Sequence, residues 1–197
     1  MPYLGKSLLH ALLLSAFFVI PAASAEEVTP PELTEEQEVA IKQELSKYAV
    51  LGQRQIVYLT KQATEEYSDT LTDDSPNMPA AWMLLEDGTT IKRISLDGQA
   101  ADAPAQIRIL MYRAALKSVA RRGKIHAAAI LYTGKLREGS DGEALVVEYE
   151  HRLGIAGNKV IPYKVENGKV AYSDPVASEK PFQIFYDSKS DVEDGLN

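Results

Sequence analysis

Alternation of apolar and polar side chains through the second half of the chain limits its possible folds more than any other feature of the sequence. Extended runs separated by turn residues are predicted at 124–134, 143–153, 158–165 and 168–174, with 181–186 as a candidate last strand. Asn167-Gly168 predicts a two-residue type I′ turn, because both central positions of that turn need positive φ. Pro162 has no amide hydrogen for a ladder, so its strand is expected at a sheet edge or with a bulge. The pattern predicts an antiparallel sheet.

A long amphipathic helix is predicted before the strands. Thr34 and Gln37 have the spacing of a capping box, and the two glutamates between them suit the positive end of a helix. The pattern allows one helix, or two helices joined near Gly52. Apolar residues that recur every three or four positions predict the buried face, on the same stripe as Gly52: Ile41, Leu45, Tyr48, Ile56, Leu59 and Ala63.

A hairpin and a second helix complete the predicted elements. Residues 80–96 contain two strand-like runs around Asp87-Gly88, which is a two-residue turn signal. The second helix is expected to begin near Asp102 or Pro104 and to end at Gly123. Its inward residues are predicted to be Ile107, Met111, Ala114 and Val119.

The order of helix, hairpin, helix and several strands is typical of an α+β domain. We expect a single domain over 34–186, with a twisted antiparallel sheet of about five to six strands, a long N-terminal helix and a second helix. Both helices are expected to pack on one face of the sheet. On element order alone, this arrangement resembles the profilin-like and roadblock-type folds, and that resemblance implies nothing about activity.

Residues 1–25 have the features of a secretory signal peptide. Lys6 precedes the apolar run 8–20, and Ala23 and Ala25 provide the small side chains of an A-x-A-like cleavage site. The apolar run is too short for a comfortable membrane span. We therefore expect cleavage near Ala25, a disordered leader at 26–33 and a flexible acidic tail at 187–197. Retention of the segment as an N-terminal anchor is the alternative.

Composition restricts the chemistry and the location. The chain contains no cysteine, so it has no disulfide, no thiol nucleophile and no thiolate metal site. An exported protein without disulfides is typical of a bacterial periplasm, which predicts a periplasmic or secreted location. The formal net charge of −7 argues against nucleic-acid and anionic-lipid partners. We expect no membrane association after signal cleavage, and a basic protein as partner.

The run Glu148–His151 gathers the residues that most resemble a site. Side chains alternate across a strand, so His151 points away from both Glu148 and Glu150. The histidine and the glutamates are therefore not expected to form a dyad. Two carboxylates about 7 Å apart match the spacing of glycosidase acids, but every E-x-E strand has this spacing. A solvated or helix-flanking surface is the simpler interpretation for both glutamates.

His126 and His151 are candidates for a metal site. A hairpin that aligns the apolar faces of 124–134 and 143–153 pairs His126 with His151, at a Cβ separation of about 5 Å. A shift by two residues pairs His126 with Tyr149 instead. Two imidazoles could bind a metal ion, but such a site normally needs a third or fourth ligand. We expect no cofactor, with both rings at the wet rim of the core as the simpler interpretation.

The sequence contains no nucleophile elbow, P-loop, dinucleotide fingerprint or regular calcium loop. We therefore expect a non-catalytic binding or inhibitory protein of the immunity type, which acts through its acidic surface and an edge strand. The alternative is a small metal-assisted hydrolase that uses His126, His151 and a carboxylate such as Glu150 or Asp174. Candidate binding residues are Trp82, Tyr163, Tyr172, Glu148 and Glu150.

Overall fold

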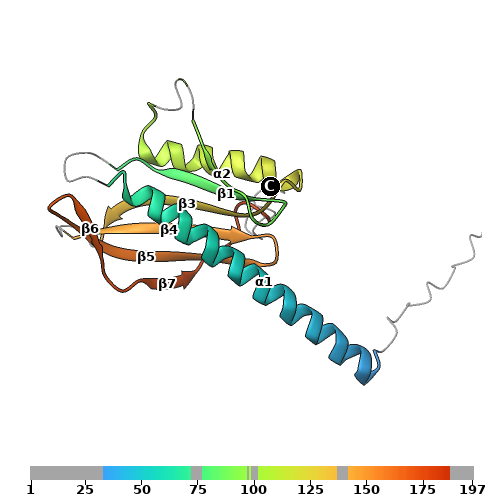
Figure 1. Cartoon of the computed structure of the whole chain (residues 1–197). Helices are drawn as coiled ribbons and strands as arrows, with labels where there is room; N and C mark the ends of the chain where they lie inside the picture. Colours follow the sequence, from blue (N-terminus) through green and yellow to red (C-terminus); the bar gives the residue numbers. More distant parts are fainter. Residues whose placement is uncertain (1–32, 72–76, 97, 99–101, 137–141, 187–197) are drawn as a thin grey trace, which may run out of the picture.

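The computed structural model describes residues 33–71, 77–96, 98, 102–136 and 142–186. The predicted signal peptide, nearly all of the predicted leader and the predicted acidic tail lie outside the described residues. Within these ranges, no helix combines the length and the apolarity needed to cross a bilayer. Helices and strands follow one another along the chain as shown in Figure 1: α1 (Glu35–Ser68), β1 (Ala80–Leu85), β2 (Ile91–Ile94), α2 (Ala105–Arg121), β3 (Ile125–Lys135), β4 (Glu143–His151), β5 (Ile155–Glu166), β6 (Lys169–Tyr172) and β7 (Val176–Glu179).

The strands form one seven-stranded antiparallel sheet in the order β2-β1-β3-β4-β5-β6, and β7 also pairs with β5. The predicted α+β class is confirmed, with more strands than expected. β7 lacks a sequence signal, because all four of its residues are exposed and none belongs to a buried face. The candidate strand at 181–186 is not a strand: this segment packs on the sheet, with Ile184 in the core.

The two helices cover opposite faces of the sheet, so the prediction of one covered face is wrong. α1 packs over Ala127 and Ala129 of β3, whereas α2 packs over Ala128 and Ile130 of the same strand. These residues alternate along β3, which is therefore buried on both sides. The second face was hard to identify because β4 carries glutamates there, and glutamates in a sequence look like a solvated face.

α1 is continuous through Gly52, which decides between the one-helix and two-helix predictions. Its N-terminus has the predicted capping box: Gln37 N donates to Thr34 Oγ1 at 3.3 Å, and Thr34 N donates to Gln37 Oε1 at 2.9 Å. Gly52 is buried against the turn between β4 and β5, where a Cβ atom would lie 2.8 Å from Ile155 Cδ1. The glycine therefore gives this turn room to approach the helix.

Only the second half of α1 packs against the sheet. The first half extends beyond the sheet (Figure 1), and the predicted inward residues Ile41, Leu45 and Tyr48 are 44%, 62% and 48% exposed. The predicted spacing of the apolar stripe is correct, but half of the stripe has no sheet beneath it. The buried residues of α1 begin at Gly52 and continue with Ile56, Leu59, Thr60, Ala63 and Tyr67.

The buried face of α2 differs from the predicted one. Its buried residues are Tyr112 and Leu116, whereas Ile107, Met111 and Ala114 are exposed. Val119 is partly buried against the core, as predicted. The neighbour of Tyr112 is Arg113, which reaches the buried Glu148, and this ion pair favours the observed rotation of the helix.

β5 is an interior strand rather than the predicted edge strand. It pairs with β4 along one side, and with β6 and β7 in succession along the other side. Pro162 lies at the break between β6 and β7. Its carbonyl accepts from Ser173 N at 2.8 Å, and its ring nitrogen faces the same side, away from β4, so the β4–β5 ladder loses no donor.

Gly52→Leu should destabilise the fold by about 2 kcal/mol, because the larger side chain pushes α1 away from Ile155. Ala49→Leu is the matched control, since it adds the same side chain nearly one turn earlier at an exposed position of α1. Urea denaturation followed by circular dichroism measures both variants. Equal stability of the two variants would contradict a close contact between the helix and the turn.

Candidate functional site

Glu148 and Glu150 of β4 point to the face of the sheet opposite to that of His151, as strand alternation predicts. His151 lies beside Gln55 of α1, whereas Glu148 lies beside Arg113 of α2. Glu148 is 7% exposed and Glu150 is fully buried. The expectation of a solvated surface is therefore wrong for both carboxylates, and the helix-flanking interpretation holds for Glu148 alone, because Glu150 lies beside residues 180–185.

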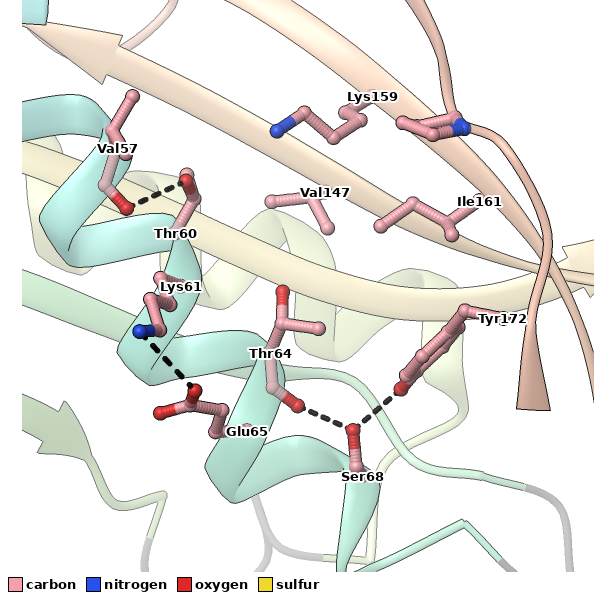
Figure 2. A pocket seen from close by; sticks show the side chains of 11 residues that line it. Val57, Thr60, Lys61, Thr64, Glu65, Ser68, Val147, Lys159, Ile161 and Tyr172 are labelled. Carbon is pink, nitrogen blue, oxygen red and sulfur yellow. Dashed lines mark hydrogen bonds and ion pairs between the residues drawn. The ribbon is translucent and has the colours of Figure 1, made fainter. Parts of the chain in front are cut away.

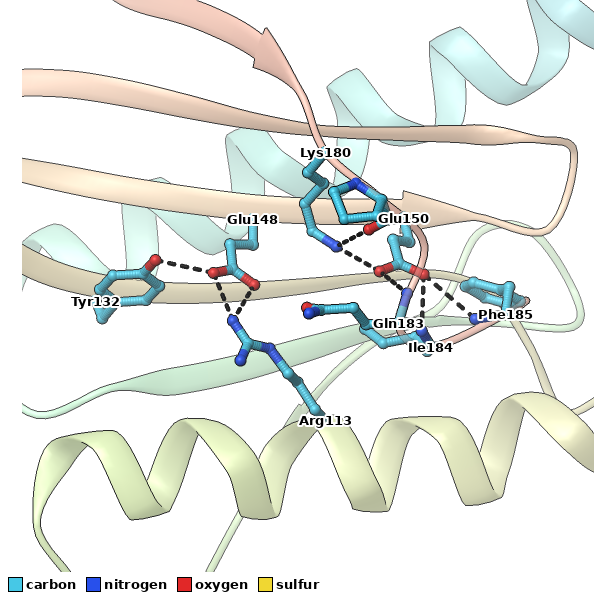
Figure 3. Close-up of polar contacts among 9 residues, drawn as sticks. Arg113, Tyr132, Glu148, Glu150, Lys180, Gln183, Ile184 and Phe185 are labelled. Atoms are coloured by element: carbon cyan, nitrogen blue, oxygen red, sulfur yellow. Dashed lines mark hydrogen bonds and ion pairs between the residues drawn. The ribbon is translucent and has the colours of Figure 1, made fainter. Parts of the chain in front are cut away.

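Glu148 is held by an ion pair and a hydroxyl group (Figure 3). Arg113 Nη2 lies 2.7 and 2.9 Å from its two carboxylate oxygens, and Tyr132 OH donates to Oε1 at 2.8 Å. Burial and the adjacent carboxylate raise the pKa of Tyr132 above its ordinary value, so the hydroxyl stays protonated as a donor. These contacts join α2, β3 and β4.

Glu150 accepts hydrogen bonds from the segment that follows β7 (Figure 3). Lys180 Nζ lies 2.5 Å from Oε1, and the backbone amides of Gln183, Ile184 and Phe185 donate at 2.8, 2.9 and 3.2 Å. Burying a carboxylate is unfavourable by several kcal/mol unless it is paired and hydrogen-bonded, and one segment supplies both kinds of contact here. Glu148 and Glu150 therefore both help to hold the fold together.

The two histidines are neighbours, but not through the predicted pairing. β3 and β4 pair one residue out of the predicted register, so Ala127 lies opposite His151. A bulge in β3 compensates for this offset, because His126 has no partner in β1 between the paired residues Ile125 and Ala127. The extra residue brings His126 to the α1 face, and the two ring centroids lie 6.3 Å apart.

Both nitrogens of His151 have partners within the fold. Nε2 lies 2.8 Å from Gln55 Oε1, and Nδ1 accepts from Leu153 N at 3.0 Å. The neutral ring therefore carries its proton on Nε2, toward Gln55. Burial, reinforced by His126 and Arg152, lowers the pKa of His151 to about 4. The ring is a neutral link between α1 and the β4–β5 turn.

In the part of the chain that the structure describes, no third metal ligand joins the histidine pair. Across the described ranges, no group of three His, Cys, Asp or Glu side chains could hold a metal ion. Asp174 follows Ser173, which bonds to Pro162, roughly 20 Å along β5 from the residue opposite His151. Glu150 lies on the other face of the sheet. The groups that the hydrolase alternative requires are therefore not brought together.

The aromatic binding candidates have different environments. Trp82 is fully buried and donates from Nε1 to Glu66 Oε2 at 2.7 Å, which makes it a core residue and not part of a binding surface. Tyr163 is also buried, and its hydroxyl donates to Glu143 Oε2 at 2.5 Å. Tyr172 is 39% exposed, so it is the one candidate of the three that a partner can reach.

Tyr172 lies in the wall of a groove of about 380 Å³ between α1 and the strands β5 and β6 (Figure 2). Its hydroxyl lies 2.5 Å from Ser68 Oγ at the end of α1, and this contact closes one end of the groove. The volume falls in the range of small-molecule binding clefts. Further residues that line the groove are Val57, Thr60, Lys61, Thr64, Glu65, Val147, Lys159, Ile161 and Pro175.

The sequence indicates Tyr172 as a binding candidate but has no sign of the groove. The groove exists because α1 packs mainly on β1, β3 and β4 and diverges from the middle of β5, and a packing geometry of this kind has no local signal. A signal for the helical wall does exist in the sequence. Basic and apolar residues alternate at spacings of three and four on the side of α1 opposite to its buried face: Lys47, Val50, Arg54, Val57 and Lys61.

Acidification should destabilise the fold through His151. Its folded-state pKa of about 4 lies below the ordinary value of 6.5, so the folded protein binds this proton more weakly than the unfolded chain does. The contribution is complete above pH 6.5 and is lost as the pH falls toward 4, by at most about 3 kcal/mol. Burial and Arg152 also lower the pKa of His126, which acts in the same direction.

Thermal unfolding measured between pH 7 and pH 4, at steps of about half a pH unit, follows this loss of stability. His151→Gln should show a shallower loss of stability over this range, because the titrating ring is gone. An identical pH dependence in the variant would contradict the role given to His151.

No protein family, no curated protein and no solved structure matches this chain at a significant level. The resemblance to profilin-like and roadblock-type folds therefore stays a prediction from element order. The structure therefore offers two candidate surfaces, which are identified from the described residues alone. One is the groove beside α1, and the other is the exposed first half of α1.

Proposed function

We propose that this chain is an exported, non-catalytic binding protein of the inhibitory or immunity type, and that it contacts a protein partner through the first half of α1. The observation that carries this proposal is the uncovered apolar stripe Ile41, Leu45 and Tyr48, which continues the buried face of α1 beyond the sheet. Apolar side chains gathered on an ordered helix indicate an interaction surface.

The energetics of the projecting helix support a partner. The part of α1 before Gly52, taken alone, would be a helix of marginal stability in water, because most helical stability in proteins comes from packing of the apolar face. The capping box at Thr34 and the pair between Lys42 and Glu38, at 3.5 Å, contribute locally. A partner that covers Leu45 and Tyr48 would add the missing packing, and Tyr is among the residues that dominate interface energies.

The acidic charge of the protein fits this location. Glu35, Glu36 and Glu38 lie in the first turn of α1, next to the apolar stripe. Acidic groups at the end of a projecting helix steer association with a basic partner. Because β5 is an interior strand, we propose that α1, and not the edge strand expected from the sequence, contacts the partner.

A photo-crosslinking residue at Leu45 should give one dominant adduct in cells, because this position would lie inside the interface. The same residue at Lys92, which is exposed on the edge strand β2, should give none. Mass spectrometry of the adduct identifies the partner. Ile41→Glu should remove the adduct without changing the melting temperature, since Ile41 has no sheet beneath it.

Three outcomes decide the proposal. One adduct at Leu45 that is lost with Ile41→Glu supports it. No adduct at Leu45 contradicts it. Equal labelling at Leu45 and Lys92 also contradicts it, because the contact would then be unspecific.

Export has its own test. N-terminal sequencing of the protein from fractionated bacterial cells should find a chain that starts at Glu26 and lies outside the cytoplasm. Ala25→Arg should block cleavage and leave the longer precursor, because the residue before the cleavage site must be small. A chain that keeps residues 1–25 and remains in the cytoplasm would contradict export.

A further inference from the structure

We propose a second docking surface on this protein, which binds an acidic amphipathic helix of a partner protein. The surface consists of the outer stripe of α1, defined as Lys47, Val50, Arg54, Val57 and Lys61, and of the groove that continues from it. It goes beyond the proposed function, because it lies on another side of the helix from Ile41, Leu45 and Tyr48 and carries the opposite charge.

The outer stripe faces away from the sheet. The buried positions of α1 include Gly52, Ile56 and Leu59, and the stripe positions Val50, Arg54 and Val57 each precede one of them by two residues. Two residues correspond to about 200° of rotation around an α-helix. The side chains of Val50 and Val57 are accordingly 51% and 53% exposed, although both are β-branched apolar residues.

The spacing of the outer stripe suits a helical partner. Its residues are separated by three, four, three and four positions, which is the repeat along which two helices pack side by side. The basic residues are Lys47, Arg54 and Lys61, and each is seven positions from the next. A partner helix therefore meets a cation, an apolar residue and a cation in turn.

The stripe is basic although the chain has a net charge of −7. In the part of the chain that the structure describes, no ion pair engages Lys47 or Arg54, and Lys61 has only an exposed contact with Glu65 at 3.9 Å. Charge complementarity across an interface favours a partner of opposite sign and suppresses others. The occupant must therefore bring acidic groups.

The groove extends this surface onto the sheet (Figure 2). Val57 and Lys61 belong both to the outer stripe and to the groove, so the two are continuous. The far wall adds Lys159 and Ile161 of β5, another cation and another apolar residue (Figure 2). A helix laid along the outer stripe would thus place one edge in the groove.

The shape and the charge distribution favour a protein segment over an anionic membrane. A groove between a helix and a strand receives a chain segment, whereas a bilayer surface is flat. The first turn of α1 also carries Glu35, Glu36 and Glu38, which an anionic bilayer would repel.

Two synthetic peptides test the proposal. Each is a helix of about four heptads with leucine and a charged residue alternating along one face. The acidic peptide carries glutamate at the charged positions, and the control peptide carries lysine at the same positions. Fluorescence anisotropy with the mature protein at low salt should show binding of the acidic peptide at least about tenfold tighter than that of the lysine peptide.

Two charge-matched variants locate the site. Lys47→Glu/Arg54→Glu/Lys61→Glu should weaken binding of the acidic peptide by at least about tenfold. Lys92→Glu/Lys164→Glu/Lys169→Glu changes the net charge equally at exposed positions elsewhere, and should change the affinity by less than about twofold. Circular dichroism melts of both variants should match the parent protein, because every substituted side chain is exposed.

Several outcomes would overturn the inference: similar affinity for both peptides, equal loss of binding in both triple variants, or no binding of the acidic peptide. Vesicles of phosphatidylcholine and phosphatidylglycerol form a further arm. Vesicle binding that depends on Lys47, Arg54 and Lys61, without peptide binding, would also overturn it, in favour of a membrane. The crosslink at Leu45 is independent of these variants, so failure here leaves the proposed function standing, and failure there leaves this surface standing.

Discussion

Burial of β3 on both faces is the constraint on which the rest of the structure depends. Ala127, Ala128 and Ala129 are all fully buried, under α1 at two positions and under α2 at the one between them. Methyl side chains let both helices approach the backbone of the same strand closely, and protein interiors tolerate extra volume poorly. Three successive small residues in the central strand therefore make a three-layer arrangement possible, with the sheet between the helices.

Hydrogen bonds to a buried carboxylate complete the layer that contains α2. Part of this face of β4 is covered by residues 180–186 instead of a helix, and Ile184 supplies the apolar contact to the core. The segment is too short and irregular to hold itself in place by backbone pairing. Glu150 supplies what is missing, since its carboxylate accepts from Lys180 and from successive backbone amides. The buried carboxylate thus holds this segment against the sheet. The residues that most resembled catalytic acids in the sequence therefore have a structural explanation.

Local signals in the sequence predicted local structure well, and long-range packing was where prediction failed. The capping box at Thr34 and the type I′ turn are present, and Asn167 and Gly168 have the positive φ values, 55° and 71°, which that turn requires. The hairpin register was wrong by one residue because both faces of β3 are apolar and buried, so matching of apolar faces does not select one register. The nature of the second face was missed because burial of Glu148 depends on Arg113 from a distant helix. For the same reason the groove could not be predicted, since it is defined by where α1 ends its passage across the strands.

The continuity of α1 through Gly52 has a mechanical consequence. The projecting half is an unbroken extension of a segment that packs on the sheet, so it moves as a rigid rod that pivots near Gly52. Its end lies roughly 25 Å from Gly52, and a tilt of about 10° at the pivot displaces that end by roughly 4 Å. Small changes where Ile155 and His151 contact Gly52 and Gln55 of the helix are therefore amplified at its far end. The turn between β4 and β5 therefore sets the direction of the projecting half of α1, although this turn is not part of the proposed contact surface.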